Sequence, residues 1–244
     1  MSKNIAVIID AGHGGIGRDG IYQTLRKNSN RWQHPDGWAY EGVINRKIAE
    51  ALETQIKAYD ETLLPDEREV LPTLKVLRVY KADIDTPLHK RIENINSFVD
   101  MQRSLKPAFK PILISIHGNA SADQKQRGYE CWVCKGASQE SRTLAEGFAI
   151  GIKDRFPDAK YRSGKKGVAY RIDSEWRSPI AILRASICPA ILTENLFFDN
   201  AEDWKLLQDE AYIWKIAQAH LQAIRYYAYT LTPDPEEKHD SDNS

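Results

Sequence analysis

Short apolar runs alternate along the chain with longer segments in which apolar residues recur every three or four positions. The apolar runs are rich in β-branched residues and predict buried strands at about 4–10, 74–80, 111–117, 128–133, 180–183 and 190–195. The periodic segments predict helices that begin at Glu41, at Pro87, near residue 139 and near residue 209. Strands that alternate with helices are typical of an α/β fold. We therefore expect a single domain with a largely parallel, mixed sheet flanked by helices.

Two stretches do not follow this alternation. Residues 11–40 form a long polar and aromatic connection between the first strand and the first helix. Residues 231–244 contain prolines, five carboxylates and a single lysine, and from Thr232 onward they lack apolar residues, which predicts a disordered tail. Because no Gly/Ser- or Pro-rich linker divides 4–229, we assign one domain to residues 1–230 and an acidic tail to 231–244.

The composition narrows the classes of function. The 34 basic and 34 acidic side chains balance, and no basic stripe is interleaved with aromatic residues, so we expect no nucleic-acid partner. Three cysteines do not make a disulfide framework. Cys131 and Cys134 could suggest a redox pair or half of a zinc site, but they fall in a predicted strand that would point them to opposite faces. We interpret both as packing residues.

The N-terminal segment carries only five apolar residues in a row before Asp10, too few for a secretory signal. No segment approaches the length of a transmembrane helix. We therefore expect a protein made in the cytoplasm without a signal peptide or membrane span. It would reach a substrate beyond the membrane by release or by unusual export.

Four ionisable residues stand where chemistry is expected. His13 follows the first strand, His117 and Glu194 end two later strands, and Glu41 begins the first helix. The carboxyl ends of parallel strands share one edge of a sheet, where ligands bind. Two imidazoles and a carboxylate, with a fourth position open to water, form a catalytic zinc arrangement, and a further carboxylate would supply the general base. Taken singly, each residue is more typical of a hydrogen-bonded loop histidine or of an acid that complements a helix dipole. Together they favour a site, because the buried runs "ISIH" and "ILTEN" place ionisable groups where burial without a partner is costly.

Family resemblance favours the catalytic interpretation. "VIIDAGHGG", "YEGVINRKIAEAL", "ILISIHGNAS", "RGYECWV" and "PAILTENLFFDNAEDWKLL" occur in the order typical of zinc-dependent N-acetylmuramoyl-L-alanine amidases of the type 3 family, which the chain resembles over about 4–228. The resemblance implies that His13, Glu41 and His117 bind one Zn²⁺ ion and that Glu194 is the catalytic glutamate. It also implies the fold, with the zinc site at the carboxyl edge of the strands.

The resemblance further implies the substrate, peptidoglycan. The bond cleaved in this family joins the lactyl group of muramic acid to L-alanine. The sequence departs from the family pattern at Gly118, where alanine is usual, and at Asn195 and Leu196, where a small residue and glycine are commoner. These departures leave Glu194 intact.

Aromatic residues crowd the connection that precedes Glu41. Trp32 and Trp38, with Tyr40, could stack on a sugar or peptide at the rim of the cleft, or could pack the long loop down. His34, in "QHPDG", could be a fifth ligand or a proton donor, but a turn histidine is the expected role.

Three further polar residues complete the candidate site. Arg91 matches a recurring arginine of the family and is expected to form an ion pair within the scaffold. Glu130 matches another family position and is a candidate partner that supports the site residues. Asn119, two residues after His117, is a candidate for contacting the substrate or supporting the ligands.

Two rival functions stay open at this stage: another zinc peptidase or deacetylase of α/β fold, and an inactive wall-binding module. The presence of Glu194 beside three candidate ligands argues against the inactive module. Some cell-division members of the family carry a helix, inserted after the "SIH" block, that plugs the zinc cleft until a partner displaces it. Here only ten residues, Gly118 to Arg127, separate His117 from Gly128, and part of that span, "SADQKQR", is polar and lacks the apolar face of a docking helix, so we expect no activator protein. The connection 16–40 is the one segment long enough to act as a lid.

Overall fold

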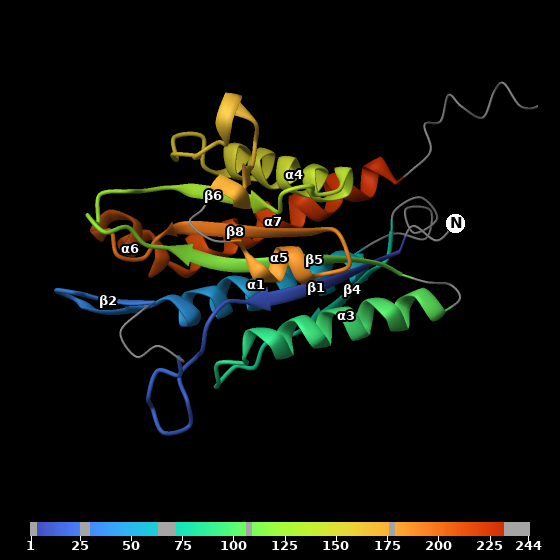
Figure 1. Ribbon diagram of the computed structural model, residues 1–244. Coiled ribbons are helices and arrows are strands. Elements are labelled where there is room, and N and C mark those ends of the chain that lie inside the picture. The colour runs from blue at the N-terminus through green and yellow to red at the C-terminus, as the bar shows by residue number, and fades with distance from the viewer. Residues whose placement is uncertain (1–3, 25–29, 63–71, 106–108, 176–178, 232–244) are drawn as a thin grey trace, which may run out of the picture.

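The structure is a computed structural model that describes residues 4–24, 30–62, 72–105, 109–175 and 179–231 (Figure 1). In this part of the chain six strands form one sheet, in the order β4-β1-β5-β8-β6-β7. The strands are β1 Ile5–Ala11, β4 Leu74–Arg78, β5 Lys110–Asn119, β6 Tyr129–Val133, β7 Arg171–Ile172 and β8 Ala190–Phe197. Neighbouring strands run parallel except β6, which is antiparallel to β8. The predicted largely parallel, mixed sheet is confirmed.

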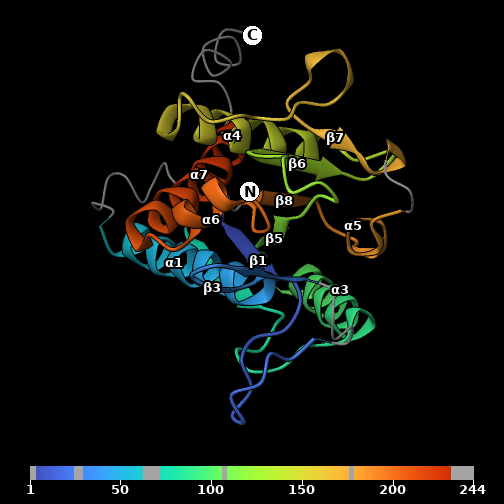
Figure 2. The ribbon, with the colours of Figure 1, turned by 90° about the vertical axis from the view of Figure 1, so that its left-hand side faces the viewer.

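Helices cover both faces of this sheet (Figure 2). Helices α1 Glu41–Thr62, α4 Gln139–Arg155 and α7 Glu210–Thr230 pack on one face, and α3 Leu88–Ser104 and α5 Ala181–Ala185 pack on the other. Helix α6 Ala201–Leu207 follows β8, and two short 3-10 turns, Lys165–Gly167 and Asp173–Glu175, flank β7. Because both faces are covered, every residue of β1 is buried, which explains its unbroken apolar sequence.

The connection 11–40 contains structure that the hydrophobic pattern did not predict. Strands β2 Arg31–His34 and β3 Gly37–Tyr40 form an antiparallel hairpin that projects from the end of the molecule where β1 and β5 finish (Figure 1). Its turn is Pro35–Asp36, with glycine next, a combination favoured in tight turns. Four-residue strands are too short for an apolar alternation to identify them. Helix α6, with seven residues, and strand β7, with two, are likewise too short to show a period and were not predicted.

The strand predicted at 180–183 is wrong. Residues Ala181–Ala185 form the single-turn helix α5, which buries Ile182 and Leu183 against the core on the α3 side of the sheet. A short apolar run fits a strand or a buried helical turn equally well. Here β8 already has β5 and β6 as neighbours, so the sheet has no open position beside it for another strand.

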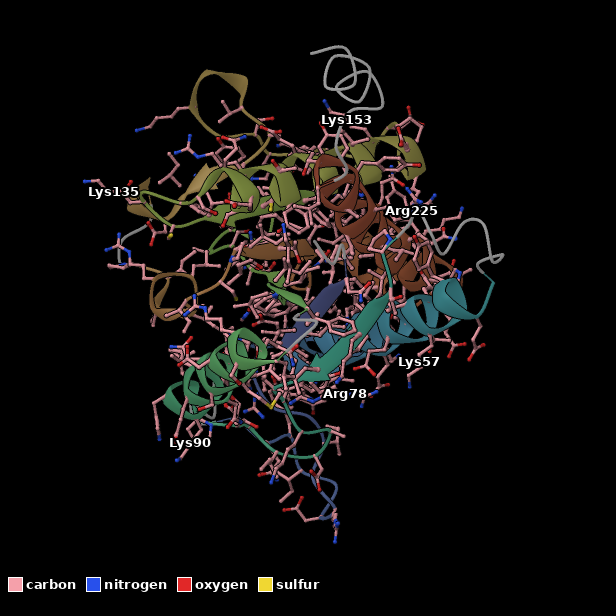
Figure 3. The ribbon with its side chains drawn as sticks, turned by 90° about the vertical axis from the view of Figure 1, so that its right-hand side faces the viewer. Lys57, Arg78, Lys90, Lys135, Lys153 and Arg225 are labelled. Atoms are coloured by element: carbon pink, nitrogen blue, oxygen red, sulfur yellow. The ribbon has the colours of Figure 1, made fainter. Side chains whose placement is uncertain are left out.

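The structure bears on several predictions from composition. Cys131 packs in the core on the α1 side of the sheet and Cys134 packs against the core on the α3 side, so the two thiols do point to opposite faces. The labelled basic side chains in Figure 3 come from separate elements and lie apart around the periphery, without forming a stripe. Among the described helices, none has both the length and the apolar character that crossing a bilayer requires. The predicted tail, apart from Leu231, lies outside the described residues.

Candidate metal centre and active site

The loop after β1 brings His13 to the carboxyl edge of the sheet. His13 itself adopts a positive φ of 61°, a conformation that few side-chain-bearing residues take. The imidazole of His117, from β5, packs directly on the α-carbon of the preceding Gly12, where any Cβ atom would overlap with the ring. The glycine before His13 therefore makes room for the second histidine.

Glu41 joins the two histidines. It is the first residue of α1, and its Oε2 lies 3.2 Å from Nε2 of His13 while its Oε1 lies 3.1 Å from Nδ1 of His117. The two imidazole rings stand edge to face with centroids 5.2 Å apart. One donor atom from each of the three residues falls within 4.8 Å of the others, a spacing at which one metal ion could be shared. Two neutral imidazoles and a carboxylate are the donor set of a catalytic zinc site.

Electrostatics in this cluster suit a cation. Burial alone would raise the pKa of Glu41, but the neighbouring His13 and His117 outweigh it and hold that pKa well below its usual range. Burial acts to lower the pKa of His13, yet the Glu41 carboxylate dominates and raises it. The cluster therefore keeps an ionised carboxylate and attracts positive charge, either a proton on His13 or a metal ion.

Two arginines fix the backbone that carries His13. The carbonyl oxygen of His13 accepts hydrogen bonds from Nη2 of Arg46, at 2.9 Å, and from Nη2 of Arg91, at 2.8 Å. Arg91 also forms a buried ion pair with Asp10, at 2.5 Å, the kind of scaffold contact expected for it. Ser115 donates to the other oxygen of Asp10 at 2.7 Å. These contacts hold the strained His13 loop against β1 and β5.

Asn30 is a site residue that sequence reasoning missed. Its side-chain nitrogen donates to Oε2 of Glu41 at 2.7 Å and lies 3.2 Å from Nε2 of His13. The backbone carbonyl of Asn30 accepts from the amide of Glu41 at 2.9 Å. No motif signalled this residue, because it belongs to the irregular connection and meets the cluster only through the tertiary fold.

Glu194 occupies the neighbouring strand position. The Cα of Glu194 on β8 pairs with that of His117 on β5 and, on the other side, with that of Glu130 on β6. Paired residues share a face of the sheet, so the three side chains emerge on the same side. Burial raises the pKa of Glu194, and the carboxylates of Glu41 and Glu130 raise it further. Its Oε2 atom is buried and has no hydrogen-bond partner in the described part of the chain.

Glu130 is held by groups on its other side. Its Oε1 pairs with Nε of Arg162 at 2.5 Å and with Nη1 of Arg171 at 3.2 Å, and its Oε2 accepts from the indole of Trp132 at 3.1 Å. The carboxylate of Glu130 is thus committed to these donors. In contrast, the carboxyl of Glu194 retains an oxygen that can exchange a proton with a bound molecule.

An irregularity in the sheet positions His117. The pairing of β5 with β8 shifts register between His117 and Asn119, where β8 contains one extra residue, and Leu196 in this bulge has a positive φ of 66°. The side-chain nitrogen of Asn195 donates to the carbonyl oxygen of His117 at 2.9 Å. The two residues that depart from the family pattern, Asn195 and Leu196, therefore lie at this bulge.

A buried chain of hydrogen bonds continues from Asn195 into α7. Thr193 Oγ1 accepts from Asn195 at 3.1 Å and lies 2.9 Å from Nε2 of His220, whose Nδ1 lies 2.9 Å from the carbonyl oxygen of Ile216. Since a carbonyl only accepts, Nδ1 of His220 carries the proton and Nε2 accepts from the threonine hydroxyl. Burial lowers the pKa of His220 to about 4, which keeps the ring neutral.

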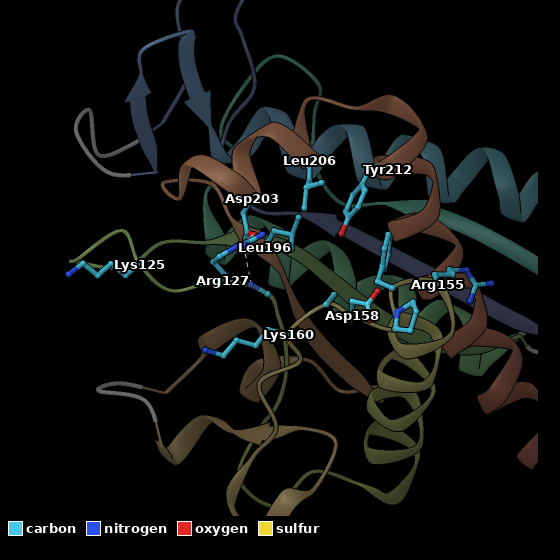
Figure 4. Close-up of a pocket in the computed structure, with 13 residues that line it drawn as sticks. Lys125, Arg127, Arg155, Asp158, Lys160, Leu196, Asp203, Leu206 and Tyr212 are labelled. Atoms are coloured by element: carbon cyan, nitrogen blue, oxygen red, sulfur yellow. Dashed lines mark hydrogen bonds and ion pairs between the residues drawn. The ribbon is translucent and has the colours of Figure 1, made fainter.

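A cavity of about 590 Å³ opens beside the cluster on the α3 side of the sheet. His13, His117 and Asn30 contribute to its wall, and Ile180, Ile182 and Leu192 provide an apolar wall. A second cavity, of about 550 Å³, is lined by a different set of residues (Figure 4). Its Asp203 is already paired with Arg127 at 2.8 Å. None of the candidate ligands, and not Glu194 either, lines this second cavity. His13 and His117 line the first cavity and not the second, so the candidate chemistry lies beside the first.

The structure places the other candidate residues around this centre. Asn119 is buried at the end of β5, where its side-chain oxygen accepts from the amide of Ala120 at 2.8 Å. His34 stacks on Trp204 at 5.3 Å and is not part of the metal-binding group found among the described residues. Trp32 and Trp38 lie on the β2–β3 hairpin, and both are exposed.

Comparison with known proteins identifies the family. The model of the family described as N-acetylmuramoyl-L-alanine amidase, Amidase_3, matches residues 7–226. The endolysin of Bacillus phage SPP1 is 26% identical over 157 residues, which cover 64% of this chain and 54% of that protein. The chain thus spans about half the length of this relative.

Two solved structures share the fold. An N-acetylmuramoyl-L-alanine amidase from Clostridium difficile 630 aligns with a TM-score of 0.64 and 21% identity, over 91% of this chain and 96% of that one. The CwlD amidase from Clostridioides difficile, in complex with the GerS lipoprotein, aligns with a TM-score of 0.63 and 22% identity, over 93% and 100% of the two chains. Because the family model matches residues 7–226, nearly the whole of this chain, the chain belongs to the N-acetylmuramoyl-L-alanine amidase family Amidase_3.

Proposed function

We propose that the protein is a zinc-dependent amidase that hydrolyses peptidoglycan at the bond between the lactyl group of muramic acid and L-alanine. Family membership supports this reaction. The observation that carries the proposal is the grouping of His13, Glu41 and His117 within 4.8 Å, on the strand edge where Glu194 keeps an unpartnered carboxyl oxygen.

His13, Glu41 and His117 would hold the ion. The donor set fits zinc, and one ion would replace the close contacts that Glu41 now makes with both imidazoles. A zinc ion in such a site polarises the scissile carbonyl and makes water more acidic. The raised pKa of His13 means that a proton competes with the metal for this ligand. Since the three candidate ligands form one group among the described residues, we expect one Zn²⁺ ion per chain.

Glu194 is the proposed general base. Its carboxyl accepts the proton of the attacking water and later delivers that proton to the leaving amine of L-alanine. Burial and the neighbouring carboxylates raise the pKa of Glu194, which favours the protonated form that the second task needs. A cation held nearby would lower that pKa and so favour the ionised form that the first task needs. Glu130 lies next to Glu194 across β6 and β8, and its ion pairs with Arg162 and Arg171 hold its carboxylate in place there.

We also propose that the enzyme needs no activating partner. The segment between His117 and Gly128 forms turns that are tied to the loop after β8, because Ser121 donates to Asp199 at 2.7 Å and Asn200 donates to the carbonyl of Gln124 at 2.7 Å. A tied segment of this length does not cross the cleft. Although CwlD was solved with GerS, that complex concerns CwlD.

The decisive experiment digests purified peptidoglycan with the zinc-loaded protein alone and measures newly freed L-alanine amino termini. We expect them to appear, with about one zinc per chain. His13→Ala should lose both metal and turnover. Glu194→Gln should retain zinc and lose roughly 10²-fold or more in turnover, the scale of general-base loss.

Other outcomes would overturn the proposal. Release of reducing sugars, or cleavage only within the stem peptide or at N-acetyl groups, would indicate a different hydrolase. Wall binding without any product would indicate an inactive module. Activity that appears only with a second protein, or after residues 16–40 are trimmed, would contradict independence from an activator or lid.

A further inference from the structure

The β2–β3 hairpin exposes two large aromatic side chains beside the candidate active site. Trp32 is 39% exposed and Trp38 is 42% exposed, although tryptophan is normally among the more buried residues. With Arg31 and Gln33 they line a shallow depression of about 320 Å³. This volume lies at the lower end of small-ligand sites, which span roughly 300–1,000 Å³. The metal chemistry does not use these residues.

The aromatic surface is ordered by its own contacts. Trp38 stacks on Tyr40 with ring centroids 6.1 Å apart and an interplanar angle of 13°, and Tyr40 continues to Tyr22 at 4.6 Å. The guanidinium of Arg31 lies 5.0 Å from the centre of the Trp38 ring. Trp38 remains 42% exposed even with these neighbours. The ring is therefore held in place while much of its surface faces solvent.

The opposite side of the hairpin is anchored to α6. His34 stacks on Trp204 with an interplanar angle of 6°, and its Nε2 donates to the carbonyl of Phe198 at 2.8 Å. The carboxylate of Asp36 accepts from Trp204 at 3.1 Å and from Gln208 at 3.2 Å. His34 and Asp36 therefore make the contacts that pack this connection against the rest of the protein. The exposed part of the Trp38 ring is not used in these contacts and is available to a ligand.

The hairpin is continuous with the metal centre. Strand β3 ends at Tyr40, and the next residue is Glu41, which contacts both candidate histidine ligands. At the base of the hairpin the amide of Glu41 donates to the carbonyl of Asn30. Trp38 and Tyr40 therefore stand on the strand that leads directly into the metal centre, so a polymer bound there has this surface close at hand.

We propose that the exposed surface formed by Arg31, Gln33, Trp38 and Tyr40, which share one face of the hairpin, binds the sugar rings of a peptidoglycan glycan strand; we call it the glycan platform. The flat apolar face of an indole suits the C–H face of a pyranose, while the side-chain amide of Gln33 carries donors for hydroxyl and acetamido oxygens. The choice of glycan rests on the proposed function, because the muramic acid at the scissile bond belongs to that strand. A stem peptide is the competing ligand.

The first test measures binding without cleavage. In the Glu194→Gln background, we expect soluble β-1,4-linked N-acetylglucosamine tetramer to bind about tenfold more weakly after Trp38→Ala, the scale of one aromatic contact. Trp38→Phe, which keeps a ring, should recover most of the affinity. The matched control is Trp214→Ala, since Trp214 is also 42% exposed but lies on α7. This control should bind as the parent does.

The second test uses kinetics with native Glu194. Trp38→Ala should raise KM for polymeric peptidoglycan about tenfold more than KM for a soluble muramoyl peptide without a glycan strand. Equal effects on both substrates, or unchanged tetramer binding, would overturn the glycan platform. Weakened binding of free stem peptide instead would assign the surface to the peptide and also reject the proposal.

Failure of the proposed function would give a different result. Tetramer binding that depends on Trp38 in a protein that releases no L-alanine amino termini would reject the amidase and retain the platform. Amidase activity together with tetramer binding that does not depend on Trp38 would retain the amidase and reject the glycan platform.

Discussion

At the residue scale, Gly12 and His13 together let the chain bring the two candidate histidine ligands close to each other. His13 adopts the strained positive φ, and Gly12 leaves the space into which the His117 ring fits. A glycine beside a histidine in the sequence suggests close approach of some group. The structure identifies that group as the second candidate ligand.

This arrangement predicts a selective effect of one methyl group. Gly12→Ala should displace the His117 imidazole and weaken zinc binding by 10-fold or more, because the added Cβ atom overlaps with the ring. Gly118→Ala is the control. There the new Cβ atom would meet Phe198 at 3.5 Å and Glu41 at 3.7 Å, which are ordinary contacts. Zinc affinity measured by competition with a chelator should separate the two variants, and equal affinities would contradict this account.

At the element scale, the β5–β8 pair does more than build the sheet. Its regular register brings His117 beside Glu194, and its bulge follows immediately after His117. Asn195 supplies a hydrogen bond to the carbonyl of His117 at this irregular point. A local defect in pairing is thus stabilised by a side chain and used to hold a candidate ligand.

Asn195→Ala should therefore affect metal binding as well as stability. It leaves the carbonyl of His117 without this donor, at a cost of about 1–3 kcal/mol in the free energy of unfolding, and we expect zinc affinity to fall about tenfold. Thr193→Val breaks the same buried chain at its next link, toward His220, but retains the Asn195–His117 bond. Comparable loss of stability with normal zinc affinity is expected for that variant. If both variants bind zinc as the wild type does, Asn195 has a structural role only.

At the scale of the whole molecule, the buried His220 predicts sensitivity to acid. Burial lowers its pKa to about 4, so the folded protein keeps the ring neutral while the unfolded chain takes up a proton below about pH 6.5. The free energy of unfolding should thus fall as the pH is lowered from 7 toward 4, by about 3 kcal/mol from this residue. His13 acts in the opposite sense, since its pKa is raised and its contribution is lost as the pH rises.

A variant isolates the effect of His220. Chemical denaturation of metal-free protein at several pH values should show a shallower loss of stability on acidification for His220→Gln than for the wild type. The contribution of His13 is common to both proteins and cancels in the comparison. Parallel pH profiles would show that His220 does not remain neutral in the folded state.

Local patterns were sufficient to predict most of the fold and to single out the candidate site residues that the structure brings together. Long apolar runs and helical periodicity report burial on one or both faces of an element, so β1, α1, α3, α4 and α7 were predictable. The strand ends marked His13, His117 and Glu194, because parallel strands deliver their carboxyl ends to a common edge. Short elements such as α5 and the β2–β3 hairpin were not predictable, since four or five residues do not show a period.

The tertiary structure alone decided which residues meet across long sequence separations. Asn30 reaches Glu41 and His13, Arg46 and Arg91 converge on one carbonyl, and Asn195 supports His117, each through contacts that no local pattern encodes. The same holds for the hairpin, where Trp38 stays exposed while His34 and Asp36 dock the other side on α6. Sequence periodicity records how one segment faces the core, whereas contacts between segments depend on how the whole chain packs. The sequence therefore determined the sheet, its edge and the chemistry placed there, and packing decided how those side chains are held and what surrounds them.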